Sequence, residues 1–276
     1  MTIIDAHAHL WERARTPQPW IDPVSMSVID RDFGVAELGA MQTSNGISGS
    51  VIVQSSNSEQ ETLDLLALAA SPTVLGVVGW VDLEGDVSAA IERLRSAPGG
   101  DALVGIRHLA HRDADPRWLS RPAVRMGLAA LASAGLPFDV VVLPGQLGDV
   151  ADTAAAHPET VFVLNHLGKP PIASGDLTEW MHDLTRIAAL PNTVAKLSGL
   201  VVEASWLDWV PGDLRPVMDH ALQAFGPDRL MFGTDWPVVE LAGGVGRWLD
   251  VLGSLSEPER TAIFAETATR TYELHA

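Results

Sequence analysis

Two histidines separated by a single residue stand near the start of the chain, in the run Asp5-Ala-His7-Ala-His9. Isoleucines precede the run, so the pattern predicts the end of a buried β-strand, in which alternate side chains point to the same face. His7 and His9 can then direct both imidazoles at one atom, as a metal ion or a polarised substrate oxygen requires. A surface pair is the alternative, but the place at the end of an apolar strand favours a ligand or catalytic role.

A carboxylate follows the last apolar run of the chain, in Phe232-Gly-Thr-Asp235-Trp-Pro237. A carboxylate beside two imidazoles can ligate a cation, or take a proton from water as a general base. The alternative for Asp235 is capping of the next helix, because Pro237 is typical of a helix start.

A third histidine closes another apolar run, in Asn165-His166-Leu-Gly-Lys169-Pro-Pro171. The glycine and the paired prolines predict a rigid turn, which would fix His166 at the end of its strand. A role as a ligand or as an acid/base is the favoured interpretation, and packing is the alternative.

The elements that must position these residues are short runs rich in Val, Ile, Leu and Phe. We expect eight strands, over Ile3–His9, Ser50–Gln54, Val74–Val81, Leu103–His108, Phe138–Leu143, Val161–His166, Val194–Ser198 and Leu230–Asp235. Between them lie stretches with helical spacing, among them Glu59–Ala70, Val87–Arg95, Val124–Ala134 and Pro216–Phe225. This alternation predicts a parallel sheet covered by helices.

Polar residues end nearly every predicted strand, and this distinguishes two arrangements of the sheet. A doubly wound open sheet would place its site at one switch point, whereas a closed barrel gathers all its strand ends at one rim. The polar strand ends are His7, His9, Gln54, Trp80, Asp82, Arg107, His108, His166, Lys196, Ser198 and Asp235. We therefore predict an α/β fold of the (β/α)8 TIM-barrel type, as a single domain over residues 1–276. In such a barrel the first and last strands are neighbours, so Asp235 reaches His7 and His9.

Composition excludes several classes of function. The formal net charge of −17 repels nucleic acids and anionic membranes. The absence of cysteine removes disulfides and thiolate chemistry. No apolar run approaches the ~18 residues of a membrane span, and the first residues lack a signal-peptide pattern. We expect a cytoplasmic protein whose partner is a small molecule, and the sequence does not indicate its oligomeric state.

Taken in order, these motifs resemble the amidohydrolase superfamily, in its amidohydrolase-related family 2. They resemble in particular the lactonase branch, which includes L-fuconolactonase-like sugar-acid lactonases and 2-pyrone-4,6-dicarboxylate lactonases. The resemblance spans essentially the whole chain. Besides the three motifs above it rests on Val53-Gln54, Glu61-Thr62, Gly79-Trp-Val-Asp82, Gly105-Ile-Arg-His108 and Lys196-Leu-Ser-Gly199.

The resemblance implies a (β/α)8 hydrolase that opens a small lactone, with a role in carbohydrate metabolism. It matches His7, His9, His166 and Asp235 to the central cluster of the family. Binuclear members carry a bridging lysine or glutamate on a middle strand, but here the fourth strand ends in Arg107 and His108. We therefore expect at most one divalent ion, Zn or Mn, on those four residues, and catalysis without a metal stays open.

A mechanism follows as a hypothesis. Asp235 would activate water, while His7 and His9, with or without the ion, would polarise the carbonyl. His166 would orient the water or protonate the leaving alkoxide. Arg107 joins this catalytic group, because its planar fork suits a carboxylate or carbonyl oxygen.

Substrate contacts are expected from further residues at or beside strand ends. Lys196 and Arg107 are cations in an acidic protein, and the alternative for each is a salt bridge to a carboxylate such as Asp139 or Asp82. The other expected contacts are Gln54, Trp80, His108 and Trp236, with core packing as the alternative for the tryptophans. Trp20 is a further aromatic that could line the pocket.

The sequence does not decide the roles of two long loops and one acidic residue. Residues 11–34 and 201–215 are expected to be irregular, either as lids or as packed extensions. Glu61 is either a metal ligand or a residue that stabilises the first turn of a helix.

Two other functions compete with lactone hydrolysis. The first is a metal-dependent decarboxylase of an unsaturated or aromatic acid, although such enzymes usually draw another histidine from a middle strand. The second is a barrel that binds a metabolite without catalysis, which the complete histidine and aspartate set argues against.

Overall fold

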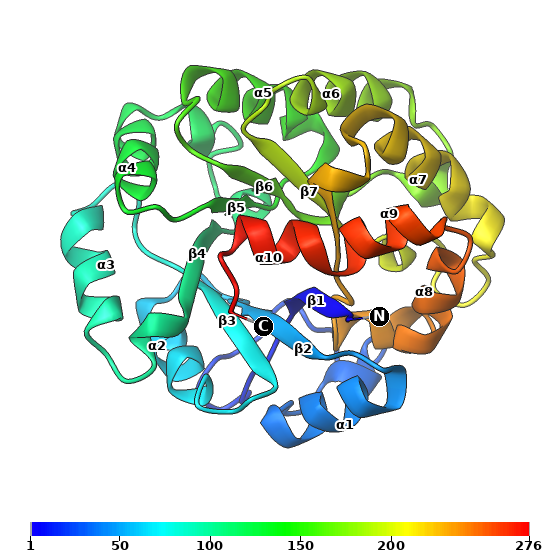
Figure 1. Ribbon diagram of the computed structural model, residues 1–276, viewed down its shortest axis with the longest axis horizontal. Coiled ribbons are helices and arrows are strands. Elements are labelled where there is room, and N and C mark those ends of the chain that lie inside the picture. Colours follow the sequence, from blue (N-terminus) through cyan, green and yellow to red (C-terminus); the bar gives the residue numbers. More distant parts are fainter. Residues whose placement is uncertain (1, 276) are drawn as a thin grey trace.

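The computed structural model describes residues 2–275. Its eight strands form one parallel sheet in the order β1 to β8, with helices around the outside (Figure 1). The strands are β1 Ile4–Ala8, β2 Gly49–Val53, β3 Val74–Gly79, β4 Leu103–His108, β5 Phe138–Val140, β6 Phe162–Leu164, β7 Thr193–Leu197 and β8 Leu230–Phe232. The predicted (β/α)8 barrel is confirmed.

Several strands end earlier than predicted. β6 ends at Leu164 and β8 at Phe232, so His166 and Asp235 lie in the loops just beyond them. The backbone supplies the reason, since φ is +54° at His166 and +58° at Asp235. Residues other than glycine rarely adopt this left-handed backbone conformation, and it is incompatible with an extended strand.

The outer layer contains the helices α1 Val35–Asn45, α2 Glu59–Leu68, α3 Val87–Arg95, α4 Pro122–Ser133, α5 Leu147–Ala156, α6 Thr178–Ala188, α7 Pro211–Phe225 and α8 Gly244–Leu252. After them come α9 Glu257–Thr261, a π-helical segment Ala262–Glu266 and α10 Thr267–Thr271.

The predicted start of α7 was wrong. The helix begins at Pro211, which occupies its first position, and Pro216 lies inside it. Proline lacks a backbone N–H, and at the first position of a helix that N–H would have no helical partner in any case. Pro216 removes only one internal hydrogen bond, which the packed helix tolerates.

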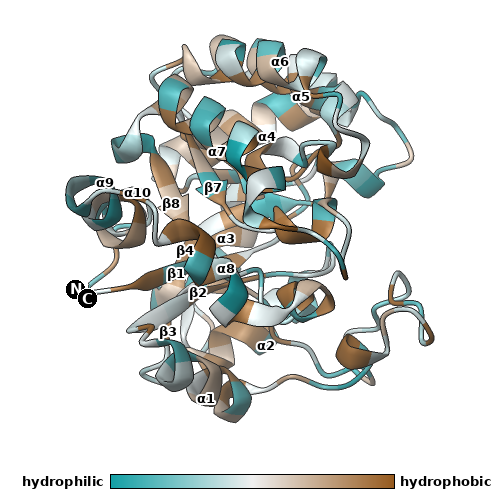
Figure 2. Cartoon of the chain, turned by 90° about the vertical axis from the view of Figure 1, so that its right-hand side faces the viewer, coloured by the Kyte–Doolittle hydropathy of each residue, from teal (hydrophilic) through white to brown (hydrophobic). Residues whose placement is uncertain are grey.

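The C-terminal helix closes one end of the barrel. In Figure 1, α9 and α10 lie across the strands, and Figure 2 shows both chain ends on one side of the molecule. Tyr272 and Leu274, which follow α10, pack with inward-facing strand residues such as Ile4, Val78 and Met231. Since β1 starts beside this end, the carboxyl ends of the strands open on the opposite side.

The first and last strands join without a regular ladder. A single bridge pairs Ala8 with Trp236. The N–H of Asp235 donates to the His7 carbonyl at 2.7 Å, and the N–H of His9 donates to the Trp236 carbonyl at 2.7 Å. The barrel is therefore closed at its mouth by the segment that carries Asp235.

The first long loop has little regular structure, as predicted, but the second is shorter than the predicted 201–215, because residues 211–215 form the start of α7. Residues 11–34 are tied by an antiparallel bridge between Trp11 and Phe33 and contain one short 3-10 helix, Ser27–Ile29. The second loop starts with the 3-10 helix Val201–Glu203 and ends where α7 begins. Among residues 2–275, we find no helix with the length and apolar character needed to cross a bilayer.

Candidate active site

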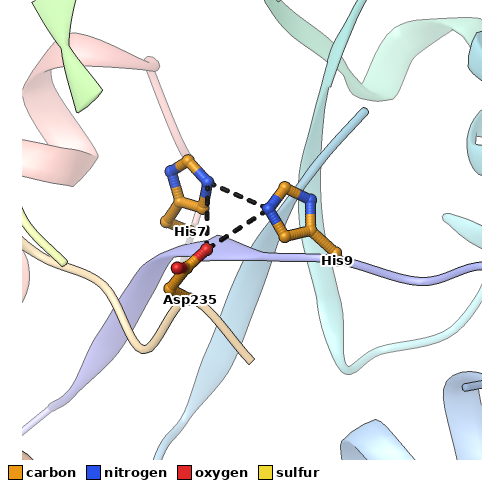
Figure 3. Close-up of side chains that lie close together, drawn as sticks. All are labelled: His7, His9 and Asp235. Atoms are coloured by element: carbon orange, nitrogen blue, oxygen red, sulfur yellow. Dashed lines mark hydrogen bonds and ion pairs between the residues drawn. The ribbon is translucent and has the colours of Figure 1, made fainter. Parts of the chain in front are cut away.

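His7, His9 and Asp235 meet at the mouth of the barrel, as Figure 3 shows. The two Nε2 atoms lie 3.2 Å apart. Oδ1 of Asp235 is 3.7 Å from Nε2 of His7 and 3.4 Å from Nε2 of His9. All three side chains are buried. Strand β1 and the loop after β8 thus bring together the groups that the sequence placed at opposite ends of the chain.

His166 completes this cluster from the loop after β6. Its ring centroid lies 4.5 Å from that of His7, and its Nε2 lies 3.9 Å from Oδ1 of Asp235. Nδ1 of His166 is 2.9 Å from the hydroxyl of Ser198. Gly199 makes this approach possible, because a Cβ there would stand 2.5 Å from Nδ1 of His166.

Burial sets the charges in the cluster. It lowers the pKa of His7 well below its usual value, with nearby Lys196 adding to the effect. It also lowers the pKa of His9, and brings that of His166 to about 3. Burial alone would raise the pKa of Asp235, but His166 and His9 outweigh it and hold that pKa below its usual value. At neutral pH the site therefore holds neutral imidazoles around one carboxylate.

The three central residues could hold a metal ion. Their ligand atoms all lie within 4.8 Å of one another. Nδ1 of His9 donates to the carbonyl of Val53 at 2.7 Å, which leaves its Nε2 lone pair directed at the cluster. Two neutral imidazoles and a carboxylate form a donor set that suits a divalent ion such as zinc. The residues therefore fit a single ion, with His166 beside it.

Arg107, at the end of β4, lies directly behind the histidines. Its Nη1 donates to Oδ1 of Asn165 at 3.2 Å and lies 3.3 Å from Nε2 of His7. Its Nη2 donates to the carbonyl of Gln54, whose side-chain amide donates back to the Arg107 carbonyl at 2.9 Å. Within residues 2–275, Nε of Arg107 has no hydrogen-bond partner. Gln54 is fully buried and holds the arginine in place.

Lys196 is buried inside the barrel. Its Nζ forms an ion pair of 2.6 Å with Oδ2 of Asp139 and lies 3.3 Å from Nδ1 of His7. The salt bridge that was the alternative to substrate contact is thus present. Contact of Lys196 with a substrate stays a prediction.

A cavity of about 110 Å³ opens onto the cluster. Among the predicted site residues His9, Arg107, His166 and Asp235 line it, and so does Trp20. His7 lies beneath the surface of the cavity and is fully buried. The lining also includes Trp11, Ser55, Leu109, His111, Arg112, Val141, Lys169, Val202 and Val238.

Five predicted contacts lie outside this lining, namely Gln54, Lys196, Trp80, His108 and Trp236. His108 stacks on Trp118 at a centroid distance of 3.6 Å, and its Nδ1 accepts a hydrogen bond of 3.1 Å from the indole of Trp80. Trp236 packs edge-on against Phe33 at 5.1 Å. In this structure, therefore, the core-packing alternative describes Trp236, while Trp80 and His108 pair with each other.

Sequence reasoning did not single out Arg112 and Lys169 as lining residues. Arg112 ends a 3-10 helix, Ala110–Arg112, and its guanidinium lies 5.0 Å from the Trp20 ring. Lys169, with φ of +56°, pairs with Glu203 of the second long loop. The available signal was their position in loops that follow β4 and β6, since such loops surround the mouth of a barrel.

Glu61 has a third role besides the two expected from the sequence. It lies in the first turn of α2 and accepts hydrogen bonds from the N–H groups of Ser55 and Ser56 and from the Ser55 hydroxyl. The Ser55 hydroxyl accepts from Gln18, and Gln18 accepts from the indole of Trp20 at 2.7 Å. Glu61 therefore anchors the loop that carries Trp20.

The fold and the site together define a (β/α)8 barrel enzyme with a histidine and aspartate cluster at its mouth. The family model described as Amidohydrolase matches residues 4–274. The chain belongs to the amidohydrolase family, and the resemblance noted in its motifs is confirmed.

Named relatives agree with this assignment. The chain is 38% identical to L-fucono-1,5-lactonase of Burkholderia multivorans over 289 residues, which is 98% of this chain and 96% of that protein. It is 37% identical to L-fucono-1,5-lactonase of Burkholderia ambifaria over 253 residues, which is 89% of this chain and 85% of that protein. A solved amidohydrolase structure from Burkholderia multivorans with bound zinc superposes with a TM-score of 0.91 at 37% identity, over 99% of this chain and 100% of that one.

Proposed function

We propose that this chain opens the ring of a small lactone of the sugar-acid type by hydrolysis. The two relatives named L-fucono-1,5-lactonase support this reaction and point to an aldonolactone as the substrate. The observation that carries the proposal is the Asp235 carboxylate, held charged at the cavity wall among three neutral imidazoles. Such a carboxylate can accept a proton from an attacking water molecule.

In the proposed mechanism, Asp235 removes a proton from water as the water oxygen attacks the lactone carbonyl carbon. His9 and His166 orient that water. The resulting oxyanion collapses and the ring C–O bond breaks. Asp235 then returns the proton to the leaving alkoxide, because the low pKa of His166 leaves its imidazole neutral, without an acidic proton to donate. The product is a hydroxy acid, whose carboxylic acid group keeps the second proton of the water and releases it to solvent at neutral pH.

Arg107 is the group best suited to stabilise the oxyanion. The Nε2 of His9 carries a lone pair and cannot donate to the carbonyl oxygen, since Nδ1 already bears the proton. Arg107 lines the cavity, and its Nε is a donor whose hydrogen bond is not satisfied by the described residues. A fixed positive donor in a site that excludes water stabilises developing negative charge strongly.

His7, His9 and Asp235 are the residues that would hold an ion, and we propose zinc because of the donor set and the zinc-bound relative. When bound, zinc supplies Lewis-acid polarisation of the carbonyl and eases ionisation of water. Elemental analysis before and after chelation tests this, with His9→Gln expected to lose the ion.

The rest of the cavity wall suits a polyhydroxylated ring. Trp20 offers an aromatic face for the C–H side of a sugar. Arg112 and Lys169 are donors to ring hydroxyls. His111 has a buried Nδ1 with no hydrogen-bond partner among residues 2–275, so a substrate hydroxyl can supply one.

A panel of aldonolactones, including L-fucono-1,5-lactone, tests the proposed function in a pH-indicator assay. Ring opening releases a proton, and we expect a rate well above spontaneous hydrolysis. Aromatic carboxylic acids, monitored for CO2 release, serve as the comparison for decarboxylation. CO2 release without proton release from any lactone would contradict the proposal.

A further inference from the structure

Arg107 is a buried cation whose oxygen partners carry no charge. It is 3% exposed, and burial lowers its pKa only to about 10, so the guanidinium is charged at neutral pH. Nη2 donates to the main-chain carbonyl of Gln54, and Nη1 donates to the side-chain amide oxygen of Asn165. Within residues 2–275 Arg107 forms no ion pair, and nearby carboxylates attract it without a hydrogen bond. Buried charges are ordinarily paired, so this one is available to a bound group.

The two oxygen acceptors hold the guanidinium from both sides. Arg107 ends β4, whereas Gln54 follows β2 and Asn165 follows β6. In the order of the sheet, β2 and β6 each stand two places from β4, one on either side. The donors of a guanidinium lie in one plane, so acceptors at both Nη atoms fix that plane. They therefore also fix the direction of Nε, which has no hydrogen-bond partner among the described residues.

The orientation of the Asn165 amide follows from its other neighbours. Its Nδ2 donates to Oδ2 of Asp139 at 2.8 Å and to the carbonyl of Val163 at 3.3 Å. Both oxygens are acceptors, so the amide nitrogen must face them and the amide oxygen must face Arg107. The hydroxyl of Tyr272 donates to the other oxygen of Asp139 at 2.7 Å and so fixes that carboxylate.

An amide at this position differs from a carboxylate in its effect on the arginine. A carboxylate would also accept from Nη1, but it would cancel the guanidinium charge and would stand against Asp139. The neutral oxygen of Asn165 holds the same donor and leaves the charge uncompensated. In a site that excludes water, a fixed charge of this kind interacts strongly with an anionic group.

We infer that Asn165 is a positioning residue that holds Arg107 in place without neutralising it. Asn165 is fully buried and does not line the cavity, so it acts through the arginine. Its importance for turnover rests on the proposed function, in which Arg107 stabilises the oxyanion. The fixed orientation of the guanidinium does not rest on that function.

The test compares the wild-type protein with Asn165→Leu, which has a side chain of similar size and no acceptor. The Gln54 acceptor is a main-chain oxygen, so Asn165 supplies the one oxygen partner of Arg107 that a substitution can remove. Side-chain 1H–15N spectra report on the guanidinium, and Arg107→Lys assigns its signals. We expect separate signals for the two Nη groups in the wild type, because rotation is restricted, and averaged signals in Asn165→Leu.

The kinetic effect should fall on turnover. A misplaced oxyanion donor weakens an interaction that forms only in the transition state, so kcat of Asn165→Leu should fall by about 10-fold or more while KM changes little. If this variant fails to fold, Asn165→Ser replaces it, because the shorter side chain leaves room for a water molecule. Asn165→Ser should show the same changes to a smaller extent.

Asn192→Leu is the matched control. The Asn192 amide donates to the carbonyls of Ala154, His157 and Thr160, just before β7 and therefore at the end of the barrel opposite the mouth. This variant also loses buried amide hydrogen bonds. It should lower the free energy of unfolding without changing the Arg107 signals or kcat.

A double-mutant cycle separates positioning from a general structural role. Lysine lacks the planar fork, so Asn165→Leu should cost little further kcat in an Arg107→Lys background. Additive losses would refute the inference, as would unchanged Arg107 signals in Asn165→Leu or a kcat no lower than that of Asn192→Leu. If the Arg107 signals average in Asn165→Leu but the wild type hydrolyses no lactone, the proposed function fails and the positioning of Arg107 stands.

Discussion

The backbone N–H of Asp235 donates to the carbonyl oxygen of His7 at 2.7 Å, so Asp235 and the first histidine of the cluster are fixed to each other through the main chain. Asp5 reinforces this junction, because its carboxylate accepts from the N–H and the hydroxyl of Thr234 and from the N–H of His7. The relative position of the two side chains therefore does not depend on a flexible loop.

Replacement of Asp235 by asparagine should abolish turnover while the fold stays intact. Asparagine tolerates the positive φ of this position, so the backbone is not disturbed. Removal of the proposed general base should lower kcat by at least about 10²-fold. Lactone hydrolysis and near-UV circular dichroism check this prediction. Asp208→Asn, in an exposed turn, is the control, and near-normal activity of Asp235→Asn would end the proposed mechanism.

Gly199→Ala should impair both stability and catalysis. Gly199 has φ of +64°, and a Cβ there would meet Nδ1 of His166 at 2.5 Å and Oδ2 of Asp235 at 3.1 Å. Displacement of these groups by about 1 Å can lower kcat by roughly 10²-fold. Gly46→Ala is a matched control, because φ is +67° there with open space around it.

In the control, the free energy of unfolding should fall by only about 1 kcal/mol, which is the cost of placing alanine in this backbone conformation. Urea unfolding and steady-state kinetics of both variants separate the two effects. Equal kcat values for Gly199→Ala and Gly46→Ala would show that contact with His166 has no catalytic importance.

The stability of the protein should fall as the pH is lowered from about 7.5 to about 5.5. Burial lowers the pKa of His166 to about 3, and that of His108 to about 4. Both values lie below that of an unfolded histidine, about 6.5. The unfolded chain therefore binds more protons as the pH falls, which costs about 1 kcal/mol of stability for each histidine by pH 5.5.

Asp5 opposes this trend, since burial raises its pKa to about 6 and it binds its proton more readily when folded. Stability from Asp5 is present at low pH and is lost as the pH rises through 6. Urea unfolding at a series of pH values measures the sum of the histidine and Asp5 contributions to stability. His166→Gln should flatten the dependence and His182→Gln, with a side chain 72% exposed, should not. A midpoint that does not change with pH would contradict the buried neutral histidines.

Gln18→Met should weaken substrate binding more than turnover. Gln18 bonds to the Ser55 hydroxyl and to the Trp20 indole, and Trp20 lines the cavity. Loss of two hydrogen bonds of about 1 kcal/mol each would raise KM by up to roughly 30-fold if Trp20 contacts the substrate. Gln60→Met, at an exposed helix position, is the control. An unchanged KM would mean that the first long loop does not shape the site.

The barrel and the central cluster could be predicted because both follow from residue patterns that are local in the sequence. Apolar runs alternate with stretches of helical spacing, and nearly every apolar run ends in a polar residue. The pairing of His7, His9 and Asp235 then follows from closure, which makes the first and last strands neighbours.

Lys196 shows where local patterns stop being informative. Its place near the end of β7 suggested a residue at the rim, with a salt bridge to a carboxylate such as Asp139 as the alternative. That salt bridge is present, and the residue that supports Asp139, Tyr272, follows α10. No spacing in the sequence links these three positions. Arg112 and Lys169 were missed for a related reason, because the path of a loop, unlike that of a strand, has no periodicity to read.

The seam between β1 and β8 is made from main-chain groups of His7, His9, Asp235 and Trp236, and not from their side chains. The side chains at this rim can therefore be replaced one at a time without breaking the main-chain hydrogen bonds that close the barrel.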